Sequence, residues 1–185
     1  MAETIKVLGI AGSLRKESYN KWALRAAQLL APEHIKVDTF DIAGIPLFNQ
    51  DDERNPSPKL VEFKKAIRAA DAILFVTPEY NYSIPGVLKN AIDAASRPYG
   101  ESAWSGKPVA IMGASVGNIG TARAQYHLRQ TFVFLNMYPV NQPEVMIGNA
   151  AQRFDQEGNL TDETTATLIK DLLQKLADLT LKLRD

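Results

Sequence analysis

The chain has 185 residues, of which 45% are hydrophobic and 23% are charged, as is usual for one globular domain with a full core, so we expect residues 1–185 to form a single domain. Its 21 basic and 21 acidic residues give a net charge of zero, so we expect neither nucleic acid nor an anionic membrane surface as a partner. The absence of cysteine excludes disulfides, thiol catalysis and cysteine-ligated metals, and we expect no metal site. Without a long apolar segment or a signal peptide, the chain is predicted to be cytoplasmic and not inserted in a membrane.

The first predicted element is a strand from residue 5, which breaks at Gly12 and leads into a helix that starts near residue 20. The loop between them holds three short polar side chains and one cation, which are Ser13, Ser18, Asn20 and Arg15. Hydroxyls and a guanidinium at a helix N-terminus favour a bound phosphate. The loop has neither the G-x-x-x-x-G-K-[ST] pattern of NTPases nor the G-x-G-x-x-G pattern of dinucleotide-binding domains. The alternative interpretation makes Ser18 a helix N-cap and Arg15 a solvated loop charge.

The rest of the chain alternates strands with helices. The predicted strands are 35–40, 72–76, 108–112 and one within 138–147 that Pro139 and Pro143 interrupt. The predicted helices are 60–70, one capped by Ser83 with Pro85 in its first turn, 120–134, and 161–183 capped by Thr161 or Thr164.

This alternation predicts a parallel sheet of five strands with helices on both faces. Ligands bind such sheets beyond the carboxyl ends of the strands, where the strand order reverses. That rule selects three loops for function, at residues 11–18, 77–85 and 113–120.

The second of these loops contains two tyrosines, two prolines and an amide within nine residues. Proline fixes the backbone, so the main-chain polar groups of this loop point in set directions beside an aromatic face. This is a suitable wall for a flat heteroaromatic ring. The alternative is a proline-stiffened turn with an exposed tyrosine.

The third loop reads Gly113-Ala114-Ser115-Val116-Gly117, which matches the G-x-S-x-G nucleophile elbow of esterases. A triad needs a histidine after the serine, and the chain offers only His127, within the next predicted helix. The order serine, acid, histidine is difficult to build here, so a serine esterase using Ser115 is a remote alternative.

The first loop can bind a phosphate, the second can flank a flat ring, and the third is a glycine-rich loop beside them. Together they indicate a mononucleotide site for a flavin. The motifs G-S-x-R-x-x-S-x-N at residues 12–20 and P-E-Y-N-Y-S-I-P-G-V-L-K-N-A-I-D at residues 78–93 resemble those of the NADPH-dependent FMN reductases, and within them the bacterial chromate and quinone reductases. The resemblance covers nearly the whole chain. It implies a flavodoxin-like three-layer sandwich with strand order 2-1-3-4-5.

The resemblance also implies non-covalent FMN with NADPH or NADH as the electron donor. Its implied cofactor contacts are Ser13, Arg15, Ser18 and Asn20 at the phosphate, Pro78, Glu79, Tyr80 and Asn81 along the ring, and Ser115 and Gly117 at the ring's edge. Tyr82 and Ser83 are expected to line the substrate pocket. No residue is expected to act as a general acid or base, because N5 of the flavin takes the hydride.

Donor and acceptor are then expected to use one open face of the ring in turn, by a ping-pong mechanism. The implied small-molecule acceptors are quinones, chromate, azo and nitro compounds and free flavin. The competing interpretation is a flavodoxin-like electron carrier with FMN but no substrate site. Such carriers are typically strongly acidic, so the neutral charge of this chain favours the enzyme.

The predicted helix at 120–134 carries more large apolar residues than one buried face requires, which are Tyr126, Leu128, Phe132, Val133 and Phe134. Tyr99, Trp104 and Tyr138 are expected to extend this aromatic surface. With the oligomers common in the family, this predicts a homodimer or homotetramer in which a neighbouring subunit completes the acceptor pocket. The alternative is a helix with a wide face turned to the core.

Overall fold

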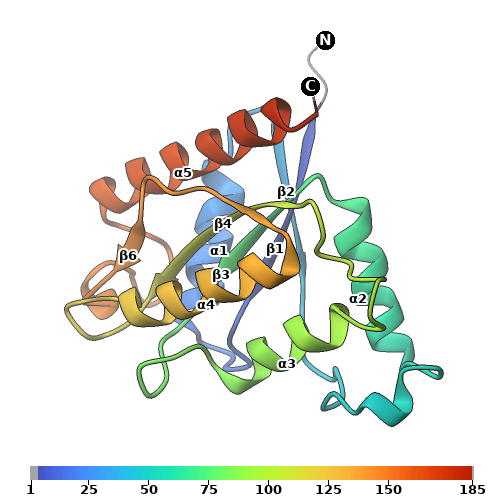
Figure 1. The fold of residues 1–185 in the computed structure, drawn as a ribbon. Coiled ribbons are helices and arrows are strands. Elements are labelled where there is room, and N and C mark those ends of the chain that lie inside the picture. The colour runs from blue at the N-terminus through green and yellow to red at the C-terminus, as the bar shows by residue number, and fades with distance from the viewer. Residues whose placement is uncertain (1–3, 185) are drawn as a thin grey trace.

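The computed structural model describes residues 4–184 and confirms the predicted α/β class (Figure 1). Its strands are β1 (Ile5–Ala11), β2 (Ile35–Phe40), β3 (Ala72–Val76), β4 (Pro108–Ala114), β5 (Tyr138–Pro139) and β6 (Val145–Ile147). Its α-helices are α1 (Tyr19–Leu30), α2 (Pro58–Ala69), α3 (Gly86–Ala95), α4 (Ala122–Leu135) and α5 (Glu163–Lys182). Two short 3₁₀ helices lie at Gln50–Asp52 and Ala150–Gln152.

The sheet is parallel, with the order β2-β1-β3-β4-β5, as the flavodoxin-like resemblance implied. Its fifth position is shared by two short strands, because β6 also pairs with β4. The predicted last strand is thus split, and Pro143, which has no N–H to donate, lies in the gap between the two pieces.

Each face of the sheet has its own hydrophobic core. Helices α1 and α5 cover one face, where Leu24, Leu172 and Leu176 pack against alternate strand residues. Helices α2, α3 and α4 cover the other, around Phe63, Leu88 and further buried side chains of that layer. Strands β3 and β4 are buried along their whole length, which explains their uninterrupted apolar sequences.

Two helix starts differ from the sequence prediction. Asp162, and neither Thr161 nor Thr164, caps α5, and its carboxylate accepts bonds from the main chain and the hydroxyl of Thr165. These bonds hold the pKa of Asp162 below its usual value. Ser83 does not cap α3, whose N-cap is Pro85 without a side-chain bond.

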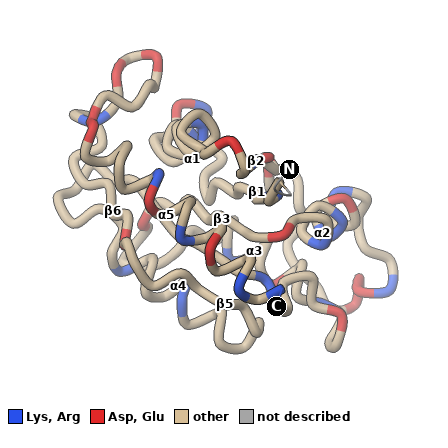
Figure 2. The backbone as a smooth tube through the Cα atoms, turned by 90° about the horizontal axis from the view of Figure 1, so that it is seen from above, with Lys and Arg blue, Asp and Glu red and all other residues tan. Residues whose placement is uncertain are grey.

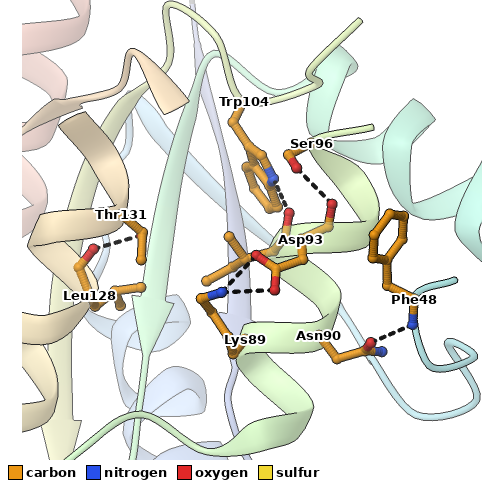
Figure 3. A network of polar contacts seen from close by, with 9 residues as sticks. Phe48, Lys89, Asn90, Asp93, Ser96, Trp104, Leu128 and Thr131 are labelled. Carbon is orange, nitrogen blue, oxygen red and sulfur yellow. Dashed lines mark hydrogen bonds and ion pairs between the residues drawn. The ribbon is translucent and has the colours of Figure 1, made fainter. Parts of the chain in front are cut away.

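Helix α3 is tied to its surroundings by side chains that Figure 3 shows. The indole Nε1 of Trp104, a fully buried residue, donates to the carbonyl of Ile92 at 2.9 Å. The amide of Asn90 accepts from the main-chain N–H of Phe48 at 2.8 Å and donates to the carbonyl of Pro46 at 2.8 Å. The two bonds of Asn90 fix α3 beside the segment after β2, and the bond of Trp104 ties α3 to the segment before β4.

Acidic and basic residues are interspersed along the chain in Figure 2, in keeping with its zero net charge. Among residues 4–184, none of the helices is both long enough and apolar enough to cross a membrane.

Candidate functional site

The three loops selected from the sequence start at the same level of the sheet. Ala11 pairs with Val76, and Val76 pairs with Met112, so β1, β3 and β4 end side by side. The strand order reverses between β1 and β3, which is where open α/β sheets bind their ligands. The structure therefore brings the predicted site loops together at one edge (Figure 1).

The first loop presents hydroxyls at the start of α1. Ser13 and Ser18 are both buried, and their hydroxyl oxygens accept bonds from the main chain of Arg15 at 3.4 Å and Asn20 at 3.3 Å. Ser18 is the N-cap of α1, as the alternative interpretation of this residue has it. A capping hydroxyl still has a hydrogen to donate to a bound anion, and Arg15 is exposed at the mouth of the loop.

Asn20 connects the first loop to the third. Its side chain is 3% exposed, donates to the carbonyl of Ala114 at 2.9 Å and accepts from the N–H of Ala114 at 2.9 Å. The amide thereby satisfies both main-chain groups at the end of β4. In the structure, the side chain of Asn20 therefore holds the start of α1 against the end of β4.

The second loop contains a tight turn built on Asn81 and Tyr82. Tyr80 and Ser83 exchange two main-chain hydrogen bonds, of 2.9 and 3.0 Å, across these two residues. Asn81 and Tyr82 have φ angles of 50° and 67°, as a type I′ turn requires. Tyr80 and Tyr82 are 53% and 67% exposed, so the aromatic side of the turn is open to a ligand.

Glu79, which precedes this turn, points inward. Its side chain is 6% exposed and accepts from the N–H groups of Arg123 at 3.0 Å and Ala124 at 3.1 Å. A carboxylate at a helix N-terminus satisfies unpaired donors and stabilises the helix dipole. Glu79 therefore caps α4 from a distant loop, and it also forms an ion pair with the Arg123 guanidinium.

The third loop is held by its own main chain. The Ser115 hydroxyl accepts from the N–H of Gly117 at 3.2 Å, and the Ser115 N–H donates to the carbonyl of Ile147 at 3.0 Å. His127 contacts a different serine, with 3.0 Å between its Nδ1 and the hydroxyl of Ser83. His127, the histidine that the esterase alternative requires, therefore lies against Ser83 of the second loop and not against Ser115.

Arg123 is the residue at this edge that sequence reasoning missed. Its guanidinium lies over the Tyr82 ring, 3.6 Å from the centroid, besides pairing with Glu79. No pattern in the sequence marks it, because the contact joins residues 41 positions apart that the fold alone brings together.

The donor set of the first loop suits a phosphate dianion, because it combines two hydroxyls, an arginine and a helix N-terminus. The exposed tyrosines of the neighbouring loop suit a planar ring. A cavity of about 470 Å³ lies elsewhere, between residues 46–57 and the helices α2 and α3, and none of the predicted site residues lines it.

Comparison with known proteins identifies the family. The model of the NADPH-dependent FMN reductases matches residues 5–152, which include all three loops. An NAD(P)H-dependent FMN reductase of Pseudomonas aeruginosa is 58% identical over 177 residues, which cover 95% of each chain. A 2-hydroxy-1,4-benzoquinone reductase of a Burkholderia species is 46% identical over 173 residues, 94% of each chain.

A solved structure agrees with these sequence relatives. The flavoenzyme NAD(P)H:acceptor oxidoreductase of Paracoccus denitrificans superposes with a TM-score of 0.89 at 36% identity, over 97% of this chain and 98% of the other.

Proposed function

This chain belongs to the family of NADPH-dependent FMN reductases, and we propose that it carries electrons from NADPH or NADH through FMN to quinones by a ping-pong mechanism. It is an NAD(P)H-dependent oxidoreductase with FMN as its cofactor, of the same kind as the FMN and quinone reductases that match it over nearly their whole length. The reductases of quinones among its relatives support quinones as the acceptors here.

We propose that Ser13, Arg15 and Ser18 bind the FMN phosphate and that Asn20 holds the loop that carries them. Pro78, Tyr80 and Asn81 would flank the ring, with Glu79 supporting them from beneath, and Ser115 and Gly117 would close its edge. Tyr82 and Ser83 would border the pocket for nicotinamide and acceptor. The observation that carries this proposal is the convergence of these three loops at the point where the strand order reverses.

FMN, when bound, supplies the hydride chemistry, since its ring accepts a hydride from a nicotinamide and passes the electrons on. The residues of the chain then need only to bind, orient and expose one face. The two exposed tyrosines leave room for donor and acceptor to occupy that face in turn. Chromate, azo and nitro compounds and free flavin are further acceptors that we propose for the same face.

The test is to denature the purified protein, to identify the released cofactor by chromatography, and to measure NADPH and NADH oxidation with a quinone present. We expect FMN and quinone-dependent oxidation, with parallel lines in double-reciprocal plots. Release of FAD would contradict the proposed site. FMN without quinone-dependent turnover would identify an electron carrier.

Replacing Arg15 with alanine is expected to weaken FMN binding by roughly ten- to a hundredfold, because a charge-assisted hydrogen bond contributes about 1.5–3 kcal/mol. Fluorescence titration of the apoprotein with FMN measures the change. The circular dichroism spectrum should not change, since Arg15 is exposed. Unaltered FMN affinity would remove Arg15 from the phosphate site.

Replacing Ser115 with alanine is expected to lower quinone reductase activity only several-fold, since a single neutral hydrogen bond contributes about 1 kcal/mol. An esterase would lose several orders of magnitude when its nucleophile is removed. Quinone and ester assays on the same preparations separate the two. Ester hydrolysis that requires Ser115, without NADPH oxidation, would overturn the reductase.

We also propose that the chain forms a homodimer or homotetramer through α4. Tyr126, Val133 and Phe134 are 53%, 85% and 81% exposed, which leaves an apolar surface, whereas Leu128 and Phe132 of the same helix are buried in the core. Tyr99 and Tyr138 are exposed as expected, whereas Trp104 is fully buried among the aromatic rings of the core and cannot join this surface. Sedimentation of the holoprotein tests the assembly.

We further propose that the protein acts in the cytoplasm, where NADPH and NADH are available as donors. We also propose that residues 1–185 form a single domain.

A further inference from the structure

The start of α4 holds the turn at residues 80–83 through two side chains, one helical turn apart. Arg123 lies over the Tyr82 ring with 3.6 Å between its guanidinium carbon and the ring centroid. His127 lies 3.0 Å from the Ser83 hydroxyl through its Nδ1. Residues i and i+4 share one face of a helix, so a single face of α4 contacts both residues that we place at the substrate pocket.

The ion pair of Arg123 with Glu79 sets the plane of the guanidinium. Glu79 is buried and is itself fixed by two N–H groups of α4, so its carboxylate cannot follow a moving partner. A guanidinium is planar and rigid, and one edge bonded to a fixed carboxylate orients both of its faces. One of those faces covers Tyr82.

The arrangement has features that stability alone does not favour. Tyr82 has a φ angle of 67°, a conformation that costs free energy for a bulky side chain. The Nε–H of Arg123 is buried without a hydrogen-bond partner. Buried polar groups without hydrogen bonds and residues with a left-handed backbone conformation are concentrated at functional sites, where geometry matters more than stability.

We propose that Arg123 is a positioning residue, which holds the Tyr82 ring at the border of the acceptor pocket and so sets the affinity for quinones. The guanidinium does not itself touch the reacting atoms in this role. It would keep the ring from rotating into the pocket that the proposed function assigns to the acceptor. This inference rests on the proposed function, because that proposal places Tyr82 at the pocket.

The first test uses the apoprotein and needs no turnover. Chymotrypsin cleaves after aromatic residues, and the bond after Tyr82 lies in an exposed turn. Removal of the stack by Arg123→Met is expected to raise the rate of cleavage at this bond about five- to tenfold, as mass spectrometry of the fragments measures it. Arg129→Met is the matched control, because it removes an arginine of the same helix whose bond goes to the carbonyl of Val140.

The second test uses the FMN-loaded enzyme. Arg123→Met is expected to raise KM for a quinone about fivefold, while kcat and the Kd of FMN stay within twofold. Arg123→Lys keeps the positive charge beside Glu79 but has no planar face, so its Tm should match that of the parent protein while its quinone KM stays as high as in Arg123→Met. In a Tyr82→Leu background, Arg123→Met should have no further effect on KM.

Unchanged cleavage after Tyr82 in Arg123→Met, or a normal quinone KM in Arg123→Lys, would overturn the positioning role. An effect of Arg123→Met that persists in the Tyr82→Leu background would assign it to the helix cap instead. If the parent protein does not reduce quinones, the proposed function fails, and the proteolysis still decides whether Arg123 holds the turn.

Discussion

Replacing Gly113 with alanine lowers the free energy of unfolding by about 3 kcal/mol or more, because the added methyl group has no space. A Cβ at this position would lie 2.2 Å from the main-chain oxygen of Thr77 and 2.2 Å from the Thr121 hydroxyl oxygen. Both residues are fully buried, and they begin the second loop and α4. The strand end must therefore shift, which moves both the second loop and the start of α4 beside the proposed flavin site.

Thermal unfolding measures this effect. For a chain of this size, 3 kcal/mol corresponds to a fall in Tm of roughly 6–12 °C. Gly86→Ala is the matched control, because a Cβ there has no heavy atom within 4 Å and the residue opens α3. Alanine should be neutral there or should stabilise the protein by up to about 1 kcal/mol. Equal Tm values for the two variants would show that β4 tolerates the methyl group.

Replacing Asn20 with alanine is expected to cost about 2–4 kcal/mol, since it leaves the buried N–H and carbonyl of Ala114 without partners. The loss also frees the third loop from α1, so FMN affinity should fall although the hydroxyls of Ser13 and Ser18, which we propose as phosphate ligands, remain. Urea unfolding and FMN titration of the same preparation measure both effects.

Asn20→Asp separates the two bonds of this amide. Aspartate keeps an acceptor for the Ala114 N–H, but it loses the donor to the carbonyl and places a charge beside it. It should therefore be no more stable than Asn20→Ala. Wild-type stability in Asn20→Ala would mean that neighbouring groups or water satisfy Ala114.

The fold was predictable because its patterns are local. Continuous apolar runs identify β3 and β4 as strands buried on both faces, and the structure confirms them. The division of the last strand into β5 and β6 was harder to predict, because it depends on how far β4 extends to pair with Val145–Ile147. The cap of α5 was misassigned because Thr161, Asp162 and Thr164 all have suitable side chains, and only the geometry of the turn selects one.

The candidate site was predictable as a set of loops and not as a set of contacts. Proline, glycine and hydroxyl residues at strand ends selected three loops, and the structure places the strand ends that carry them side by side. The inward direction of Glu79, the bridge from Asn20 to Ala114 and the stack of Arg123 on Tyr82 join residues 41 to 94 positions apart. No periodicity encodes such pairs, since they follow from the packing of α1 and α4 against the sheet.

The chain has two tryptophans, and they lie in different cores. Trp104 is buried on the side of α2, α3 and α4, whereas Trp22 is half-buried on the side of α1 and α5. The centroids of the Trp22 and Phe154 rings are 6.1 Å apart. Emission from Trp104 should accordingly be blue-shifted relative to that from Trp22. With one indole on each side of the sheet, two single-tryptophan proteins would give each layer its own optical signal, and a kinetic trace could record which layer comes apart first.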